Sequence, residues 1–267
     1  AFISYPPALN SHRNTDLMTP ALLDTAAAAL AELLAFTQPA DAVLSAFFRK
    51  HSKLGGRDRG FVAESVYGVI RRLRSLEQVT GGRSPRRLLL AWLARQGGHT
   101  LREFEAVVSK NEMEWLKEIK AVRLDDAPAA VRLDLPDWLH ERLAEREGER
   151  LEALMAALNR PAPLDLRVSR ISREAAQVNL AESGIEAEPT PWSPWGLRLK
   201  GKPALNKHPL FLDGVLEVQD EGSQLLALLT GARRGEMVCD FCAGAGGKTL
   251  ALGAMMKNTG RLYAFDV

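Results

Sequence analysis

Cysteine is scarce in this sequence, which contains only Cys239 and Cys242 among its 267 residues. Such a pair offers no disulfide framework for a chain of this size, so a reducing compartment is expected. Long uncharged apolar runs are also missing, which argues against a membrane-spanning helix. The apolar segment from Leu22 to Leu34 is interrupted by acids and lacks a basic lead-in, so it does not resemble a signal peptide. These absences predict a cytoplasmic protein without membrane contact.

Metal-ligand spacing is absent as well. The 5 histidines form no recognisable ligand set. Cys239 and Cys242 do form C-x-x-C, whose other interpretations are a redox pair or half of a zinc site. A second C-x-x-C would be needed to complete a structural zinc site, and the sequence has none. We therefore expect no bound metal.

Charge is present in both signs but is distributed unevenly. The formal net charge is only +2, yet residues 49–102 carry 13 Lys or Arg against 3 acids. Residues 103–160 reverse the balance, with 14 acids against 9 bases. A basic segment followed by an acidic one indicates a surface that attracts a polyanion such as nucleic acid. A solvated helical surface is an equally good interpretation of the charge alone.

The length favours two or three domains. Residues 1–16 lack periodicity and are interpreted as a leader, whereas residues 17–150 have helical spacing throughout and predict an all-α domain. One expected helix, from Arg57 to Leu76, has an apolar face and a basic face. Another is expected from Thr100 to Lys110.

Short strands begin after residue 150. Residues 151–215 show a β-α-β-β pattern and predict a small α+β subdomain that links the flanking regions. Residues 216–267 then contain a strand from Glu236 to Phe241, a glycine-rich turn, a helix from Lys248 to Lys257 and a second strand from Arg261. This order predicts the first β-α-β part of a Rossmann-like domain, so the expected fold class is multidomain with α, α+β and α/β parts.

The glycine-rich turn, DFCAGAGGKT at residues 240–249, resembles several nucleotide-binding loops. A Walker A loop requires glycine at position 242, where this sequence has Cys242. A dinucleotide fingerprint fits Gly244 and Gly246 but places Thr249 where a third glycine or alanine belongs. What these loops share is close backbone approach to a ligand and free N–H groups at a helix N-terminus. Asp266, at the end of the second strand, is the expected partner of a ribose hydroxyl.

Together, VQDEGSQLLALL, VCDFCAGAGGKTLALGAMM and GRLYAFDV resemble the motifs of the RsmB/Sun family of S-adenosylmethionine-dependent RNA cytosine-5 methyltransferases. The family loop is D-x-C-A-A-P-G-G-K-T, from which this chain departs at Gly244 and Ala245. Upstream, RDRGFVAESVYGVIRR is similar to the family's NusB-like RNA-binding domain. The segments NRPAPLDLRVSR and FLDGVLEVQDEGSQ resemble its linking subdomain.

The resemblance implies the site residues and the ligands. The methyl donor, S-adenosyl-L-methionine, would be bound by Cys242, Ala243, Gly244, Ala245, Gly246, Gly247, Lys248 and Asp266. The substrate would be ribosomal RNA, of the 16S type, and a monomer is the starting expectation. Carbon 5 of cytosine is a poor nucleophile, so the family's reaction passes through a cysteine adduct at carbon 6. The resemblance places that cysteine after Val267, so we name no catalytic residue and expect the chain to be truncated.

RNA contact is assigned to the basic helical region. The candidates for phosphate contact are Arg57, Arg59, Arg71, Arg72, Arg74, Arg83, Arg86 and Arg87. Each has a solvent-facing arginine as its alternative interpretation. The 5 tryptophans could stack on bases but are more typical of core positions. Two functions therefore stay open at this point: an RNA methyltransferase, or an RNA-binding module without catalysis.

Overall fold

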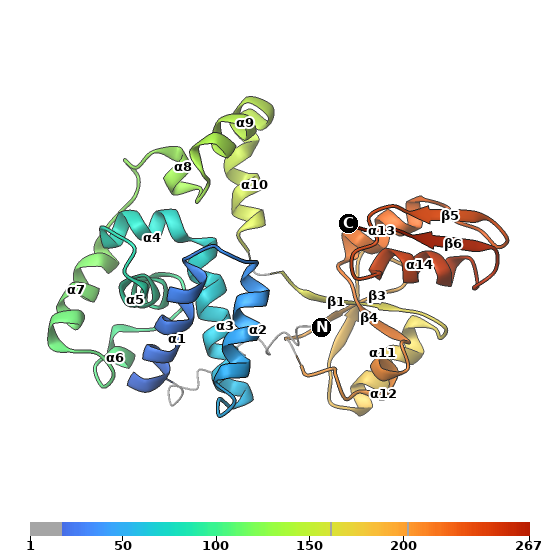
Figure 1. Ribbon diagram of the computed structural model, residues 1–267, viewed down its shortest axis with the longest axis horizontal. Coiled ribbons are helices and arrows are strands. Elements are labelled where there is room, and N and C mark those ends of the chain that lie inside the picture. Colours follow the sequence, from blue (N-terminus) through green and yellow to red (C-terminus); the bar gives the residue numbers. More distant parts are fainter. Residues whose placement is uncertain (1–17, 161, 202) are drawn as a thin grey trace. The chain divides into compact units, whose positions relative to one another are not determined.

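The computed structural model describes residues 18–160, 162–201 and 203–267, so the expected leader at residues 1–16 lies outside the described residues. The chain forms two compact units that divide between residues 161 and 162. The first is helical and the second combines helices and strands, as Figure 1 shows, so the mixed α/β character predicted from the sequence is confirmed. Each unit is described separately below. No helix within the described ranges is long and apolar enough to cross a membrane.

The first unit is built from short helices. Their bounds are α1 Pro20–Leu33, α2 Ala40–Lys50, α3 Gly56–Arg71, α4 Leu73–Thr80, α5 Pro85–Arg95, α6 Leu101–Phe104, α7 Lys110–Ala121, α8 Ala129–Arg132, α9 Asp137–Glu147 and α10 Leu151–Leu158, with a 3₁₀ turn at Gly148–Arg150. The core contains Leu23, Phe47, Val62, Leu89 and Phe104, all of them buried. α3 packs closely on α5 because Gly68 has no side chain: a Cβ there would lie 2.2 Å from the Trp92 ring.

Two helix predictions in this unit were wrong. The helix expected from Arg57 to Leu76 is interrupted at Arg72, and α4 begins at Leu73. Asp134 explains the break, because its carboxylate accepts a 2.8 Å hydrogen bond from the Ser75 N–H and pairs with Arg72. The helix expected from Thr100 to Lys110 is only the single turn of α6.

α7, which follows that turn, was not predicted. It begins at Lys110 behind a capping box, in which Ser109 Oγ accepts from the Glu112 N–H and Glu112 accepts from the Ser109 N–H. The S-x-x-E pattern that encodes this helix start is present in the sequence.

The second unit begins with a four-stranded sheet. Its elements are β1 Leu164–Val168, α11 Arg173–Glu182, β2 Ala187–Pro189, β3 Gly196–Leu199, α12 Pro209–Leu212 and β4 Leu216–Val218. The strand order is β2-β3-β1-β4, and all neighbours are antiparallel. Leu166, Leu180, Leu197 and Leu216 form its buried core. β4 and α12 were missed in the sequence because each is only one short turn or strand between loops.

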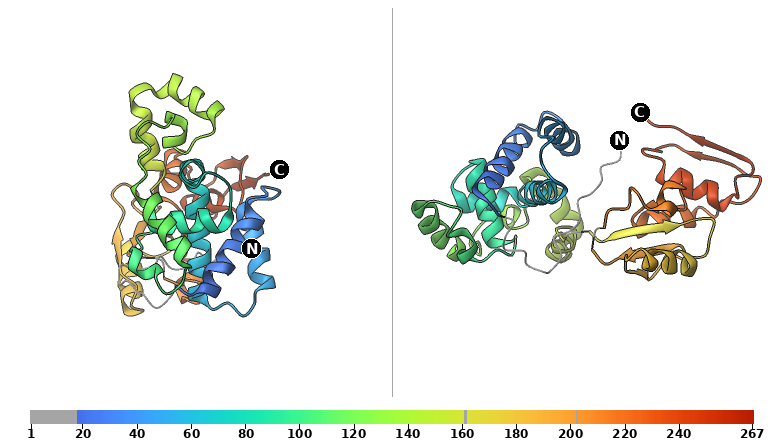
Figure 2. Two further views of the ribbon diagram at one scale, coloured as in Figure 1. Left: turned by 90° about the vertical axis from the view of Figure 1, so that its left-hand side faces the viewer. Right: turned by 90° about the horizontal axis from the view of Figure 1, so that it is seen from below.

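The chain then continues through α13 Glu221–Leu229, β5 Met237–Asp240, α14 Gly247–Met255 and β6 Arg261–Ala264. β5 and β6 pair in parallel, with Cys239 opposite Tyr263, and α14 packs along the pair (Figures 1 and 2). Gly260, with φ +85°, makes the turn into β6; a Cβ there would lie 2.2 Å from the Glu236 carbonyl oxygen. This is the β-α-β order that the sequence predicts.

Candidate functional site

The turn between β5 and α14 has the left-handed backbone that its glycines permit. Gly244 and Gly246 have φ values of +53° and +86°, a region that residues with a Cβ rarely occupy. The Gly246 N–H donates to the Ala243 carbonyl at 2.8 Å, and the Leu250 N–H donates to the Gly246 carbonyl at 2.8 Å. The chain therefore turns tightly from the strand into the helix.

The two residues that follow β6, Phe265 and Asp266, contact this turn. The Ala243 N–H donates to the Phe265 carbonyl at 2.9 Å, and the Gly244 N–H donates to the carboxylate of Asp266. Asp266 is exposed, so its carboxylate lies both at the glycine turn and at the surface. The structure thus brings the predicted acid and the predicted glycines together, across 22 residues of sequence.

The amino end of α14 is open to a ligand. Gly247, Lys248 and Thr249 form its first turn, and the N–H groups of a first helical turn have no intrahelical acceptor. Such groups and the helix dipole attract a negatively charged group. Cys242, Ala245 and Lys248 are exposed around the turn, and both cysteines are free. The turn is consequently suited to close approach of a ligand through its backbone.

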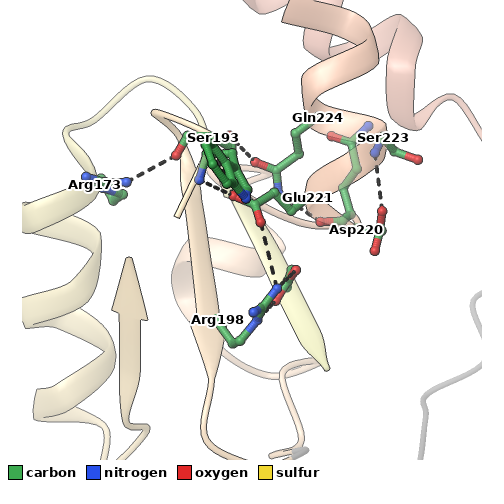
Figure 3. A network of polar contacts seen from close by, with 10 residues as sticks. Arg173, Ser193, Arg198, Asp220, Glu221, Ser223 and Gln224 are labelled. Carbon is green, nitrogen blue, oxygen red and sulfur yellow. Dashed lines mark hydrogen bonds and ion pairs between the residues drawn. The ribbon is translucent and has the colours of Figure 1, made fainter. Parts of the chain in front are cut away.

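A buried polar network supports the segment that leads to this turn (Figure 3). Glu221, at the start of α13, accepts hydrogen bonds from the N–H groups of Trp192 at 2.6 Å and Ser193 at 2.8 Å. Ser193 Oγ donates to Gln224 Oε1 at 2.6 Å, and Arg198 approaches Glu221 at 3.9 Å. Burial raises the pKa of Glu221, but these hydrogen bonds outweigh it and the pKa is lowered. The network therefore fixes α13 to the loop between β2 and β3.

Gln219 and Gln224 were not identified as site residues from the sequence. The signal that could have found them is polar residues in a short apolar context, VQDEGSQLLALL. Both side chains are buried, which for glutamine requires hydrogen-bond partners. Gln224 Nε2 donates to the Gln219 carbonyl at 2.8 Å, so the two residues act on one stretch of backbone just before α13.

The eight predicted RNA-contacting arginines differ in their surroundings. Arg72 and Arg74 pair with Asp134 and Asp137 on the segment around α8 and α9, at 3.3 and 2.6 Å. Arg86 pairs with both Glu112 and Asp24. The hydrogen bond from Arg86 lowers the pKa of Glu112 to about 2. These three arginines thus hold the helical unit together.

The other five candidate arginines differ in how far their guanidinium groups are engaged. Arg59 donates to the Leu54 carbonyl at 3.0 Å, Arg83 pairs with Glu77, and Arg87 stacks over the Trp115 ring. Arg57 and Arg71 are exposed, and no ion pair joins either to an acid in the part of the chain that the structure describes. Among the tryptophans, Trp138 and Trp192 are 60% and 75% exposed, whereas Trp92, Trp115 and Trp195 are partly buried.

Comparison with known proteins supports the resemblance seen in the sequence. The model described as "Methyltr_RsmF/B-like, ferredoxin-like domain" matches residues 135–206, a range that includes β1, α11, β2 and β3. A Synechocystis sp. protein named "Probable ribosomal RNA small subunit methyltransferase B" is 29% identical over 85% of this chain and 59% of its own length. The Pasteurella multocida "Ribosomal RNA small subunit methyltransferase B" is 41% identical over 43% of this chain and 26% of its own.

The fold has a counterpart among solved structures. The crystal structure of PH0851 is similar with a TM-score of 0.66 and 21% identity, over 94% of this chain and 64% of that one. The chain spans less than two thirds of the length of each of these proteins. The resemblance seen in the sequence is nevertheless confirmed: residues 135–206 match the RsmF/B-like ferredoxin-like domain, and the chain is similar to proteins named ribosomal RNA small subunit methyltransferase B.

Proposed function

We propose that the protein transfers a methyl group from S-adenosyl-L-methionine to carbon 5 of a cytosine in ribosomal RNA, of the 16S type. The observation that carries the proposal is the contact of Asp266 with Gly244 at the open end of α14. The names of the relatives support a ribosomal RNA substrate.

The residues at this turn fit the methyl donor. A carboxylate at the end of β6 can accept hydrogen bonds from ribose hydroxyls, and the left-handed glycines leave the backbone uncovered. The free N–H groups at the amino end of α14 can bind a carboxylate. Cys242, Ala243, Gly244, Ala245, Gly246, Gly247 and Lys248 would hold the donor mainly through backbone groups, and Asp266 through its side chain.

The donor, when bound, supplies an electrophilic methyl group, and the chain's own residues position it. Asp266 and the glycine turn would orient the nucleoside part, and the first turn of α14 would hold the charged end. In the reaction that the family resemblance implies, a cysteine thiolate adds to carbon 6 and carbon 5 takes the methyl group. Loss of the carbon-5 proton to a base then expels the thiolate and restores the ring. In the family that the sequence resembles, the cysteine of the donor-binding loop is not the nucleophile, so neither Cys239 nor Cys242 is assigned this role.

The domain layout belongs to the same proposal. We assign residues 17–150 to an all-α NusB-like RNA-binding domain, 151–215 to the linking α+β subdomain, and 216–267 to the first part of a Rossmann-like domain. Arg57 and Arg71, which are exposed, are the best placed of the predicted arginines for phosphate contact. The arginines that pair within the helical unit would contribute less.

Methyl transfer and donor binding should be measured together on the full-length protein. The assay follows tritium from labelled S-adenosylmethionine into protein-free small-subunit ribosomal RNA and maps 5-methylcytosine in the product. Transfer to one cytosine is the expected result. RNA binding without donor binding or transfer would instead support the alternative, a non-catalytic RNA-binding module. Donor binding with methylation of another atom would contradict the cytosine-5 assignment alone.

A further inference from the structure

Gln219 is held at almost every polar group that it has. Its backbone N–H donates to the Asp165 carbonyl at 3.0 Å, and its own carbonyl accepts from Gln224 Nε2 at 2.8 Å. Its side-chain Oε1 accepts from Arg167 Nε at 2.7 Å. The residue is 7% exposed, so these bonds fix a buried side chain in one conformation.

Arg167 also determines which way the amide points. An arginine can only donate hydrogen bonds, so the amide atom that faces it must be the oxygen. The NH₂ group of Gln219 is therefore directed to the other side. No hydrogen-bond acceptor meets that group among the described residues, although every other polar group of Gln219 is bonded.

The free NH₂ group faces the glycine turn. Gln219 Nε2 lies 3.5 Å from the position that a Cβ on Gly247 would occupy. Gly247 is the first residue of α14, whose open N–H groups already favour an anion. The NH₂ group of a buried side chain, with its orientation fixed and with no acceptor among the described residues, thus lies beside a helix N-terminus.

Arg167 places a positive charge behind the Gln219 amide, which is the sign that favours an anion at the turn. Arg167 is 2% exposed, and no carboxylate lies within ion-pair distance of it among the described residues. Burial lowers the pKa of Arg167 and nearby Glu217 opposes that shift, but an arginine stays protonated. Its charge polarises the Gln219 amide and adds positive potential at the turn.

We propose that Gln219 binds the carboxylate of the methyl donor's amino-acid part, with Arg167 as the residue that positions its amide. This rests on the proposed function. Asp266, an acceptor, contacts Gly244 at one end of the turn, and Gln219, a donor, faces Gly247 at the other. The two side chains accordingly suit the two ends of S-adenosylmethionine. Asp266 can accept from the ribose hydroxyls, and Gln219 can donate to the carboxylate.

The test uses Gln219→Glu, which preserves the shape of the side chain and still gives Arg167 an acceptor, but replaces the NH₂ donor with oxygen. The ligands are S-adenosylhomocysteine and 5′-methylthioadenosine, which share the nucleoside and the thioether and differ in the amino-acid part. Affinities are measured by calorimetry on the full-length protein. Gln177→Glu on α11 is the matched control, since Gln177 also loses an amide bond, to the Ala187 carbonyl.

Gln219→Glu should weaken S-adenosylhomocysteine about 10-fold or more and change 5′-methylthioadenosine by less than about twofold. Gln177→Glu should alter neither affinity. Equal losses for both ligands, no loss, or tighter binding of S-adenosylhomocysteine through its ammonium group would overturn the assignment of Gln219 while leaving the donor site intact. Failure of the unmodified protein to bind either ligand would overturn the proposed function itself, and the assignment with it. Arg167→Lys, which retains the charge but loses the Nε contact, should reproduce the selective loss in weaker form.

Discussion

The hydroxyl of Thr249 donates a 2.6 Å hydrogen bond to the carboxylate of Asp240, and so joins the last residue of β5 to the first turn of α14. Asp240 thus lies near a helix end whose open N–H groups suit an anionic ligand. The bond from the hydroxyl engages one of its oxygens and fixes the spacing between the strand and the helix.

Thr249→Val should lower the free energy of unfolding by about 1 kcal/mol, because it keeps the β-branched shape and removes only this bond. Urea denaturation followed by circular dichroism measures the change. Thr25→Val on α1 is the control, since its hydroxyl bonds the Ala21 carbonyl at an exposed position. Equal effects of the two substitutions would show that the contact with Asp240 has no special weight.

Asp266→Asn should weaken binding of S-adenosylmethionine by about 10-fold or more. The amide oxygen can still accept from the Gly244 N–H, so the turn keeps its shape, but the charge offered to the ribose is lost. Calorimetry measures the affinity, and Asp213→Asn, another exposed acid of the same unit, serves as the control. An unchanged affinity for Asp266→Asn would remove this residue from the proposed site.

Stability of the helical unit should fall in acid through Glu112. Its folded-state pKa is lowered from 4.5 to about 2, first by the hydrogen bond from Arg86. A depressed acid pKa contributes stability that is present above the unfolded-state value and is lost as the pH falls toward the folded one. Between about pH 5 and pH 2.5 the unmodified protein should therefore lose more stability than Glu112→Gln. The free energy of unfolding of both proteins is measured in urea across this pH range. Equal losses in the two proteins would contradict the prediction.

Arg71 and Arg72 are neighbours with different expected roles. Arg72→Ala should lower the free energy of unfolding by about 1–3 kcal/mol, because it leaves the buried carboxylate of Asp134 without its ion-pair partner. Burial raises the pKa of Asp134 in spite of its bonds to Ser75 and Arg72, which shows how far this acid is withdrawn from water. Chemical denaturation gives the value, and a change below about 0.5 kcal/mol would contradict the structural role.

Arg57→Ala combined with Arg71→Ala should leave stability unchanged and weaken RNA binding. Loss of two phosphate contacts should also reduce the slope of log affinity against log salt by about 1.4 to 1.8. Filter binding from low to moderate salt measures both effects, with Arg123→Ala as a control for an exposed arginine outside this surface. An unchanged affinity at low salt would show that these arginines do not touch RNA.

The sequence predicted most elements that have strong local signals. The strand expected from Glu236 to Phe241, the helix from Lys248 to Lys257 and the strand from Arg261 correspond to β5, α14 and β6. The structure also brings Asp266 and the glycine turn together, because a strand and a helix of ordinary length place them at one edge. Periodicity and caps were sufficient in these places.

What the sequence could not predict depends on contacts between distant residues. The helix break at Arg72 is caused by Asp134, which lies 62 residues further along the chain. Arg86 was interpreted as a ligand for RNA, but Glu112 and Asp24 already pair with it. The orientation of Gln219 depends on Arg167, 52 residues away. No local pattern reports such partners, so an arginine on a helix surface looks the same whether it is paired or free.

Gly260 limits which residues can occupy the turn into β6. The Glu236 carbonyl lies where a side chain at position 260 would begin, so any larger residue would push β6 along or away from β5. A slip of one residue would also turn Asp266 to the opposite face of the strand. The alignment of the acid with Gly244 is therefore set at the far end of the strand, and a substitution with no contact to any ligand could abolish binding.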